Sequence, residues 1–355
     1  VRGIAALLVV FEHIPNWNSD FFNLSILRNG YLMVELFFVL SGFVIYNAYV
    51  NNIKTGRDVL RFQFLRFGRL YPVHLLFLFI FVLVEFAKFF LSKNYDISSP
   101  NSIPFEINNF TTFTAHLFLA QALGVIDHVG SFNAPSWSIS AEFYAYLLFA
   151  LIILKIYKWR VEAFTTLLVL CYVLLRMPEA GRFSYFLICL IGFSAGCLVC
   201  EVVSRQRSQL SAYAPLIPLV ALVLFLSRFP IGASYPMIFL ISAALIYSLV
   251  VSKDGFIKRV LRLKMFRSLG EISYSIYMSH FLILWIANQF IRVVLKYPEV
   301  VINGDSYPRL SIMQTIVAYI LVIVITLLTS KLIFRFIEKP LREKSRVFAF
   351  RKMNG

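Results

Sequence analysis

Four ionisable side chains lie inside long apolar stretches of the sequence, and their types suit proton transfer. They are two histidines and two glutamates, namely His13, Glu35, Glu142 and His280. A charged group in a membrane-spanning helix is costly, so each of them is a candidate functional residue. Two imidazoles and two carboxylates at similar depth would together take up, hold and release protons.

Arg2 and His13 share one face of the first apolar segment. A helix turns by about 100° per residue, so eleven residues return to within roughly 20° of the starting direction after a rise of about 16 Å. One face then carries a cation at its start and an imidazole deeper in the membrane. Glu12 points about 100° away from this face, and we expect it to be unrelated to His13. A lone buried histidine is more often bonded to a backbone carbonyl, but the other ionisable residues favour a functional role.

Arg66, Arg69 and Pro72 form an Arg-x-x-Arg-x-x-Pro pattern beside an apolar segment. Residues three apart share a helix face, and the rigid guanidinium fork of arginine suits phosphate oxygens. The pattern therefore indicates an anion-binding site. The alternative is an ordinary positively charged anchor on the cytoplasmic side of a membrane helix.

These residues must be positioned by membrane helices. The chain of 355 residues is 59% hydrophobic and only 15% charged, which excludes a cytosolic enzyme and a disordered protein. A membrane helix needs about 20 mostly apolar residues. We predict an all-α, polytopic membrane helix bundle with about ten transmembrane helices, and the segments are 2–15, 31–50, 70–92, 137–156, 161–176, 184–203, 214–228, 236–252, 272–296 and 312–336.

Lys and Arg gather in alternate connections, which predicts that both termini are cytoplasmic. The positively charged connections include 51–69, 253–267 and 331–352. The longest outer segment is 93–136, and we expect an interfacial or re-entrant helix over 110–126. We expect one transmembrane domain over 1–342 and a basic cytoplasmic tail over 343–355. The sequence starts without Met, which we interpret as a trimmed N-terminus.

The four cysteines all fall in apolar runs, and Cys197 and Cys200 are spaced as a C-x-x-C pair. A redox or zinc pair would have this spacing. No second pair and no histidine ligand lies nearby, so we expect small apolar residues in lipid, with no disulfide and no metal site.

Six motifs in order resemble the acyltransferase 3 family of membrane-bound acyltransferases, over nearly the whole chain. They are Arg2-x10-His13, the segment 37–43 (FFVLSGF), Arg66-x-x-Arg69-x-x-Pro72, the segment 135–142 (PSWSISAE), the segment 273–280 (SYSIYMSH) and the segment 337–340 (IEKP). The resemblance is to the stand-alone form, without an appended hydrolase-like domain.

The resemblance implies a multi-pass enzyme of the bacterial inner membrane. Such an enzyme O-acylates carbohydrate, most often by acetylation, on acceptors such as lipopolysaccharide or other cell-surface polysaccharide. The donor would be an acyl-coenzyme A (acyl-CoA), with no tightly bound cofactor and no nucleic acid partner. By the same resemblance, His13 would be essential, and Arg66 and Arg69 would contact the donor. Arg2 would belong to the same donor site.

We expect His13 to take the proton from a sugar hydroxyl that attacks the thioester. Glu35 or Glu142 would orient the imidazole, and His280 or Tyr144 would donate to the developing oxyanion. Two alternatives stay open at this stage. One is an acyl group carried on His13 itself, and the other is a proton-coupled transporter of a glycan or small molecule.

Overall fold

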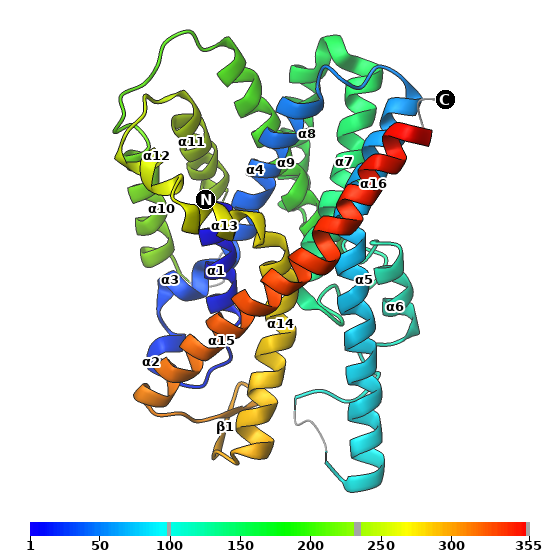
Figure 1. The fold of residues 1–355 in the computed structure, drawn as a ribbon, viewed down its shortest axis with the longest axis vertical. Helices are drawn as coiled ribbons and strands as arrows, with labels where there is room; N and C mark the ends of the chain where they lie inside the picture. The colour runs from blue at the N-terminus through cyan, green and yellow to red at the C-terminus, as the bar shows by residue number, and fades with distance from the viewer. Residues whose placement is uncertain (98–100, 231–235, 353–355) are drawn as a thin grey trace.

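The computed structural model describes residues 1–97, 101–230 and 236–352. Within these ranges the chain is almost entirely helical, with one small β hairpin (Figure 1). The longer α-helices are α1 (Arg2–Glu12), α4 (Met33–Tyr49), α5 (Gly56–Tyr95), α7 (Trp137–Ile156), α8 (Arg160–Leu175), α9 (Ser184–Arg205), α10 (Leu216–Arg228), α11 (Met237–Val251), α14 (Ser273–Gln289), α15 (Ile312–Ile333) and α16 (Lys339–Lys352).

Short helices and turns join the longer ones. The short α-helices are α2 (Ser19–Phe22), α3 (Ser25–Arg28), α6 (Phe110–Leu117), α12 (Phe256–Leu261) and α13 (Lys264–Glu271). The 3-10 turns are η1 (Asn29–Leu32), η2 (Ala134–Ser136), η3 (Tyr157–Trp159) and η4 (Pro178–Phe183), and the π-helical turns are η5 (Phe290–Val294) and η6 (Phe334–Glu338).

Each of the ten apolar segments is helical, which confirms a membrane helix bundle. By length and composition, five helical runs in the described part of the chain can cross a membrane. They are Ser25–Tyr49, Gly56–Tyr95, Ala134–Leu175, Ala180–Arg205 and Ile312–Arg351. Leu216–Arg228 and Met237–Val251 are shorter apolar helices. The count of ten spans and the orientation of the termini stay predictions.

Helix α5 begins well before the apolar segment that predicted it. The side chain of Thr55 accepts a hydrogen bond from the backbone N–H of Asp58, and the Asp58 carboxylate accepts one from the backbone N–H of Thr55. This capping box starts a helix whose basic first turns had been expected to form a connection. Arg66 and Arg69 therefore lie on a rigid helix that continues through Pro72.

The expectation of one helix over 110–126 is only partly met. Helix α6 ends at Leu117, and Leu119 has a φ of 54° in the left-handed region. A helix cannot continue through that conformation. The remaining residues up to η2 form turns, and the backbone N–H of Ala122 donates to the Ser140 hydroxyl on α7. Helix α6 itself is joined to α5, because the His116 carbonyl oxygen lies 2.9 Å from the Nε2 of His74.

A β hairpin lies between α14 and α15, and the apolar pattern did not predict it. Strand β1 (Glu299–Ile302) pairs antiparallel with β2 (Asp305–Pro308). Asn303 and Gly304 form the turn with φ values of 53° and 91°. An Asn-Gly pair is the usual sequence of such a two-residue turn.

Helices α4 and α9 cross closely. A Cβ on Gly42 would lie 2.0 Å from the carbonyl oxygen of Phe193, so only glycine fits there. Small residues at such crossings let two backbones approach in a membrane bundle. Helix α9 also packs against α7 and α8, while α1 packs against α4, α13 and α14.

Candidate active site

His13 lies at the C-terminal end of α1, and its ring is held by two contacts. Its Nδ1 is 2.9 Å from the carbonyl oxygen of Val9 and 2.7 Å from the Oε2 of Glu12. The side chain remains 24% exposed. A proton on Nδ1 is shared with these two oxygens, so the neutral ring presents the lone pair of Nε2 as a base.

Glu12 is the carboxylate partner of His13, which differs from the prediction that Glu35 or Glu142 would orient it. The helical rule of about 100° per residue separated Glu12 from the Arg2–His13 face. That rule describes only the directions in which the two side chains leave the helix, and Glu12 is adjacent to His13, so its long side chain reaches the Nδ1 of the ring. The Arg28 guanidinium lies 3.7 Å from the Glu12 carboxylate and also donates to the Glu12 backbone carbonyl at 2.5 Å.

His280 stands beside His13, as the sequence predicted for residues at similar depth. The two ring centroids are 5.0 Å apart in an edge-to-face arrangement. His280 is fully buried on α14, with its Nδ1 3.3 Å from the Ile276 carbonyl oxygen. Its Nε2 has no hydrogen-bond partner among the residues that the structure describes.

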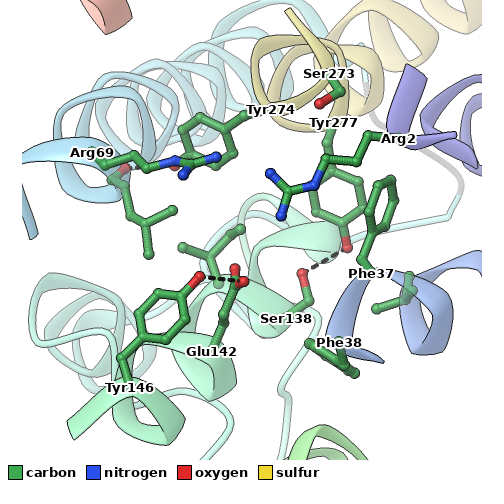
Figure 2. A pocket seen from close by; sticks show the side chains of 13 residues that line it. Arg2, Phe37, Phe38, Arg69, Ser138, Glu142, Tyr146, Ser273, Tyr274 and Tyr277 are labelled. Carbon is green, nitrogen blue, oxygen red and sulfur yellow. Dashed lines mark hydrogen bonds between the residues drawn. The ribbon is translucent and has the colours of Figure 1, made fainter. Parts of the chain in front are cut away.

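Arg2, Arg69 and Glu142 point into one small cavity of about 70 Å³ (Figure 2). They come from α1, α5 and α7, so residues far apart in the sequence meet here. The shared face of Arg2 and His13 is confirmed, because Arg2 meets the first turns of α14 and His13 meets His280 further along it. The remaining lining residues are Val34, Phe37, Phe38, Leu70, Ser138, Ile139, Tyr146, Ser273, Tyr274 and Tyr277.

The Glu142 carboxylate is held by neighbouring hydroxyl groups. It accepts hydrogen bonds from Ser41 on α4 and from Tyr146 one turn further along α7. Figure 2 shows this carboxylate below the two guanidinium groups. A carboxylate beside two arginines offsets part of their charge, so the cavity keeps an excess of positive charge. Such a cavity suits a polar or negatively charged group of a ligand.

Tyr277 connects this cavity with the histidine pair. It lines the cavity, and its ring centroid is 5.8 Å from that of His280. Its hydroxyl donates to the Pro135 carbonyl at 2.8 Å and accepts from Ser138 at 2.8 Å. His13 does not line the cavity itself. Tyr277 therefore borders both the cavity and His280, the ring that lies beside His13.

A second, larger cavity of about 630 Å³ lies at the basic start of α5. Arg69 lines both cavities and so stands at their junction. Arg66 donates to the Tyr49 hydroxyl at 3.1 Å and packs over aromatic rings. The lining residues are Tyr49, Asn52, Ile53, Asp58, Arg61, Phe62, Leu65, Arg66, Arg69, Arg342, Glu343, Arg346 and Phe350. Five arginines face two carboxylates, so this cavity suits an anion with several phosphates.

Two of the predicted residues are placed apart from these groups. Glu35 is buried in the first turn of α4, and its Oε2 has no hydrogen-bond partner in the described part of the chain. It does not line either cavity. The Tyr144 hydroxyl donates to the Phe118 carbonyl at 3.0 Å, which directs it away from the histidine pair.

The sequence reasoning missed Glu12, Arg61, Arg342 and Arg346. The Thr55-x-x-Asp58 capping pattern would have extended α5 to include Arg61. The spacing of four between Arg342 and Arg346 would have placed them on one helix face. The sequence analysis instead places Arg342 and Arg346 in the basic connection 331–352, which runs into the tail over 343–355.

The four cysteines are buried and free. Across residues 1–97, 101–230 and 236–352, no group of three or more His, Cys, Asp or Glu side chains is arranged to hold a metal ion.

Comparison with known proteins points to one family. A family model described as an acyltransferase domain matches residues 1–335. The chain is 25% identical over 386 aligned positions to the O-acetyltransferase OatA of Staphylococcus aureus, which covers 99% of this chain and 58% of OatA. It is 33% identical over 153 residues to "Protein 2 in picA locus" of Rhizobium radiobacter, which covers 40% of this chain and 73% of that protein. No solved structure matches.

Proposed function

Since the chain belongs to the acyltransferase 3 family and is an acyltransferase, we propose that it moves an acetyl group from acetyl-CoA to a carbohydrate hydroxyl. The observation that carries this proposal is the position of Arg69, which lines both the large basic cavity and the small cavity beside the histidine pair. The acceptor would be a cell-surface polysaccharide or lipopolysaccharide, and the membrane would be the bacterial inner membrane.

The donor would bind with its phosphates in the large cavity. Coenzyme A carries three phosphate groups at its nucleotide end and a thioester at the end of a flexible arm. Arg66 and Arg69 offer the guanidinium forks that bind phosphate oxygens. A cavity of about 630 Å³ is of the size of ordinary small-molecule sites. Binding there would leave the arm free to extend past Arg69.

The arm would then pass through the small cavity. Its volume of about 70 Å³ is enough for a few water-sized groups, which suits the narrow arm and excludes the nucleotide. Arg2 carries a fixed positive charge into this space and would hold polar groups of the arm. Because Arg2 begins α1 and His13 follows its end, about 16 Å further along, the thioester must extend beyond this cavity to reach His13. The Nδ1 contact of His280 with the Ile276 carbonyl favours a neutral ring whose Nε2 does not donate, so His280 would not stabilise the oxyanion.

His13 would act as the base. Its Nε2 takes the proton of the acceptor hydroxyl while the hydroxyl oxygen forms a bond to the acetyl carbonyl carbon. The bond between that carbon and the coenzyme A sulfur then breaks, and the proton passes from His13 to the thiolate. While His13 carries this proton, Glu12 stabilises the imidazolium, because its Oε2 lies 2.7 Å from the Nδ1 of His13. The products are an O-acetyl ester and coenzyme A.

The test uses purified protein in lipid nanodiscs with acetyl-CoA that carries a labelled acetyl group. Bacterial cell-envelope polysaccharide serves as the acceptor. The label that mild base releases from this polysaccharide measures ester formation. We expect ester formation together with release of free coenzyme A thiol in equal amounts. Thiol release without label on any carbohydrate would contradict the acceptor class. If neither free thiol nor labelled ester formed, the proposed donor would be contradicted.

A further inference from the structure

Helix α16 contributes two arginines to the basic cavity that no motif of the family resemblance includes. Arg342 and Arg346 are one helical turn apart and line the cavity together with Arg66 and Arg69 of α5. We propose that Arg342 and Arg346 form a phosphate-binding subsite that holds the nucleotide end of acyl-CoA. This inference rests on the proposed donor and assigns further residues to its binding.

The position of α16 is fixed by a close approach to α5. A Cβ on Gly68 would lie 2.4 Å from the Cβ of Ser345, so α16 can pack here only against a glycine. Gly68 lies between Arg66 and Arg69 in the sequence, and Ser345 lies between Arg342 and Arg346. The contact therefore brings the two arginine pairs to the same cavity. Figure 1 shows α16 continuing from α15 and lying along α5.

Two aromatic contacts hold the C-terminal part of α16 against α5. The ring of Phe348 lies 5.4 Å from that of Phe64, and the Arg61 guanidinium lies 5.5 Å from the ring of Phe350. At the other end, the Glu338 carboxylate accepts a hydrogen bond of 2.7 Å from Ser275 on α14. Arg342 and Arg346 follow Glu338 by about 6 Å and 12 Å along the helix. Both line the cavity at positions further along α16 from this anchor.

The charges of these arginines are available to a ligand. Among the residues that the structure describes, no carboxylate lies within 4 Å of Arg342 or Arg346 in an ion pair. Of the two acidic residues in the cavity, Asp58 is engaged in the capping box of α5. A ligand with several phosphates would supply the missing counter-charges. Arg66 and Arg69 would bind the phosphates nearest the arm, and the α16 pair the remaining ones.

A variant with a matched control tests this subsite. The double variant Arg342→Ala with Arg346→Ala removes two charges from the cavity side of α16. The control, Lys344→Ala with Arg351→Ala, removes two charges from the same helix at residues that line a different hollow. Binding of acetyl-CoA is measured by calorimetry in nanodiscs of zwitterionic phosphatidylcholine. Size-exclusion chromatography and the thermal unfolding midpoint show that both variants are folded.

We expect the cavity-side variant to raise the Kd for acetyl-CoA at least tenfold, about the loss of one charge-assisted hydrogen bond, and the control to leave it unchanged. The double variant Arg342→Lys with Arg346→Lys keeps the charge but loses the guanidinium fork, so its Kd should lie between those of the wild type and the alanine variant. An equal rise in Kd for the cavity-side variant and the control would overturn the subsite, since it would indicate general attraction. So would unchanged binding by the cavity-side variant.

A second arm distinguishes the phosphate of a lipid headgroup from that of the nucleotide. The same measurements are repeated in nanodiscs that contain phosphatidylglycerol. If the α16 arginines bind headgroups instead, the cavity-side variant will change acetyl-CoA binding only in these nanodiscs, and the inference fails. Wild-type protein that binds no acetyl-CoA in either lipid contradicts the proposed donor, which is a separate failure from that of α16.

Discussion

Two pairs of histidines lie inside the described part of the bundle, and they differ in the groups that face them. His13 and His280 meet edge to face, with ring centroids 5.0 Å apart, where α1 meets α14. A carboxylate lies 2.7 Å from the Nδ1 of His13, and that side chain is 24% exposed. His13 therefore has a carboxylate partner, and part of its side chain is exposed to solvent or substrate.

His74 and His116 form the other pair, and their rings are stacked with centroids 5.8 Å apart at 4°. Both side chains are almost completely buried. The Nε2 of His74 is 2.9 Å from the His116 carbonyl oxygen, and the Nε2 of His116 is 3.0 Å from the Ser131 hydroxyl. In the described part of the chain, the hydrogen-bond partners of this pair are carbonyl and hydroxyl groups, and none is a carboxylate. This pair joins α6 and the loop after it to α5.

The comparison shows that a buried imidazole in a membrane helix is not enough to indicate a base. A base needs a partner that stabilises its protonated form and a nitrogen that a substrate reaches. His13 has the partner in Glu12 and partial exposure. His116 uses its ring nitrogens in hydrogen bonds within the protein, which is the role of a structural residue.

The variant His13→Ala should have the largest effect. It removes the proposed base, and general base catalysis contributes about 10²–10⁴-fold to a rate. We expect kcat for labelled acetyl transfer to fall by that factor while the Kd for acetyl-CoA is unchanged, because His13 does not line the donor cavity. Activity above a tenth of the wild-type value in folded His13→Ala protein would contradict the assignment of the base.

Glu12→Gln should have the next largest effect. Glutamine keeps the size of the side chain but cannot stabilise a protonated imidazole as a carboxylate does. We expect a fall in kcat of roughly 10–100-fold with KM for the donor unchanged, and a smaller fall for Glu12→Asp. The control is Glu162→Gln, which neutralises an exposed carboxylate on α8. If Glu12→Gln were as active as that control, the pairing with His13 would have no catalytic role.

His116→Leu should have the smallest effect on catalysis. It leaves the Ser131 hydroxyl buried without its partner, which costs about 1–3 kcal/mol of stability. We expect a lower midpoint of thermal unfolding in detergent but an unchanged kcat per folded molecule. A loss of kcat similar to that of His13→Ala, in protein that remains folded, would show that the two histidine pairs do not differ in the way proposed.

Helix α5 shows how far the sequence pattern reached. The apolar run 70–92 predicted its membrane part, but the basic turns before it were interpreted as a connection. Hydrophobicity marks only the part of a helix that meets lipid or core, whereas Thr55 and Asp58 cap the helix at its actual start. The same reason applies to α16, whose polar sequence continues the helix of α15 through the π-helical turn η6.

The sequence by itself determined the class of the bundle, the order of the family motifs and the face shared by Arg2 and His13. These depend on composition and on the period of one helix, which are local properties. Only the tertiary structure decided that Glu12 is the carboxylate beside His13, that Glu142 faces Arg2 and Arg69, and that α16 completes the basic cavity. Contacts between helices depend on how distant segments pack, and the period of a single helix does not specify its neighbours.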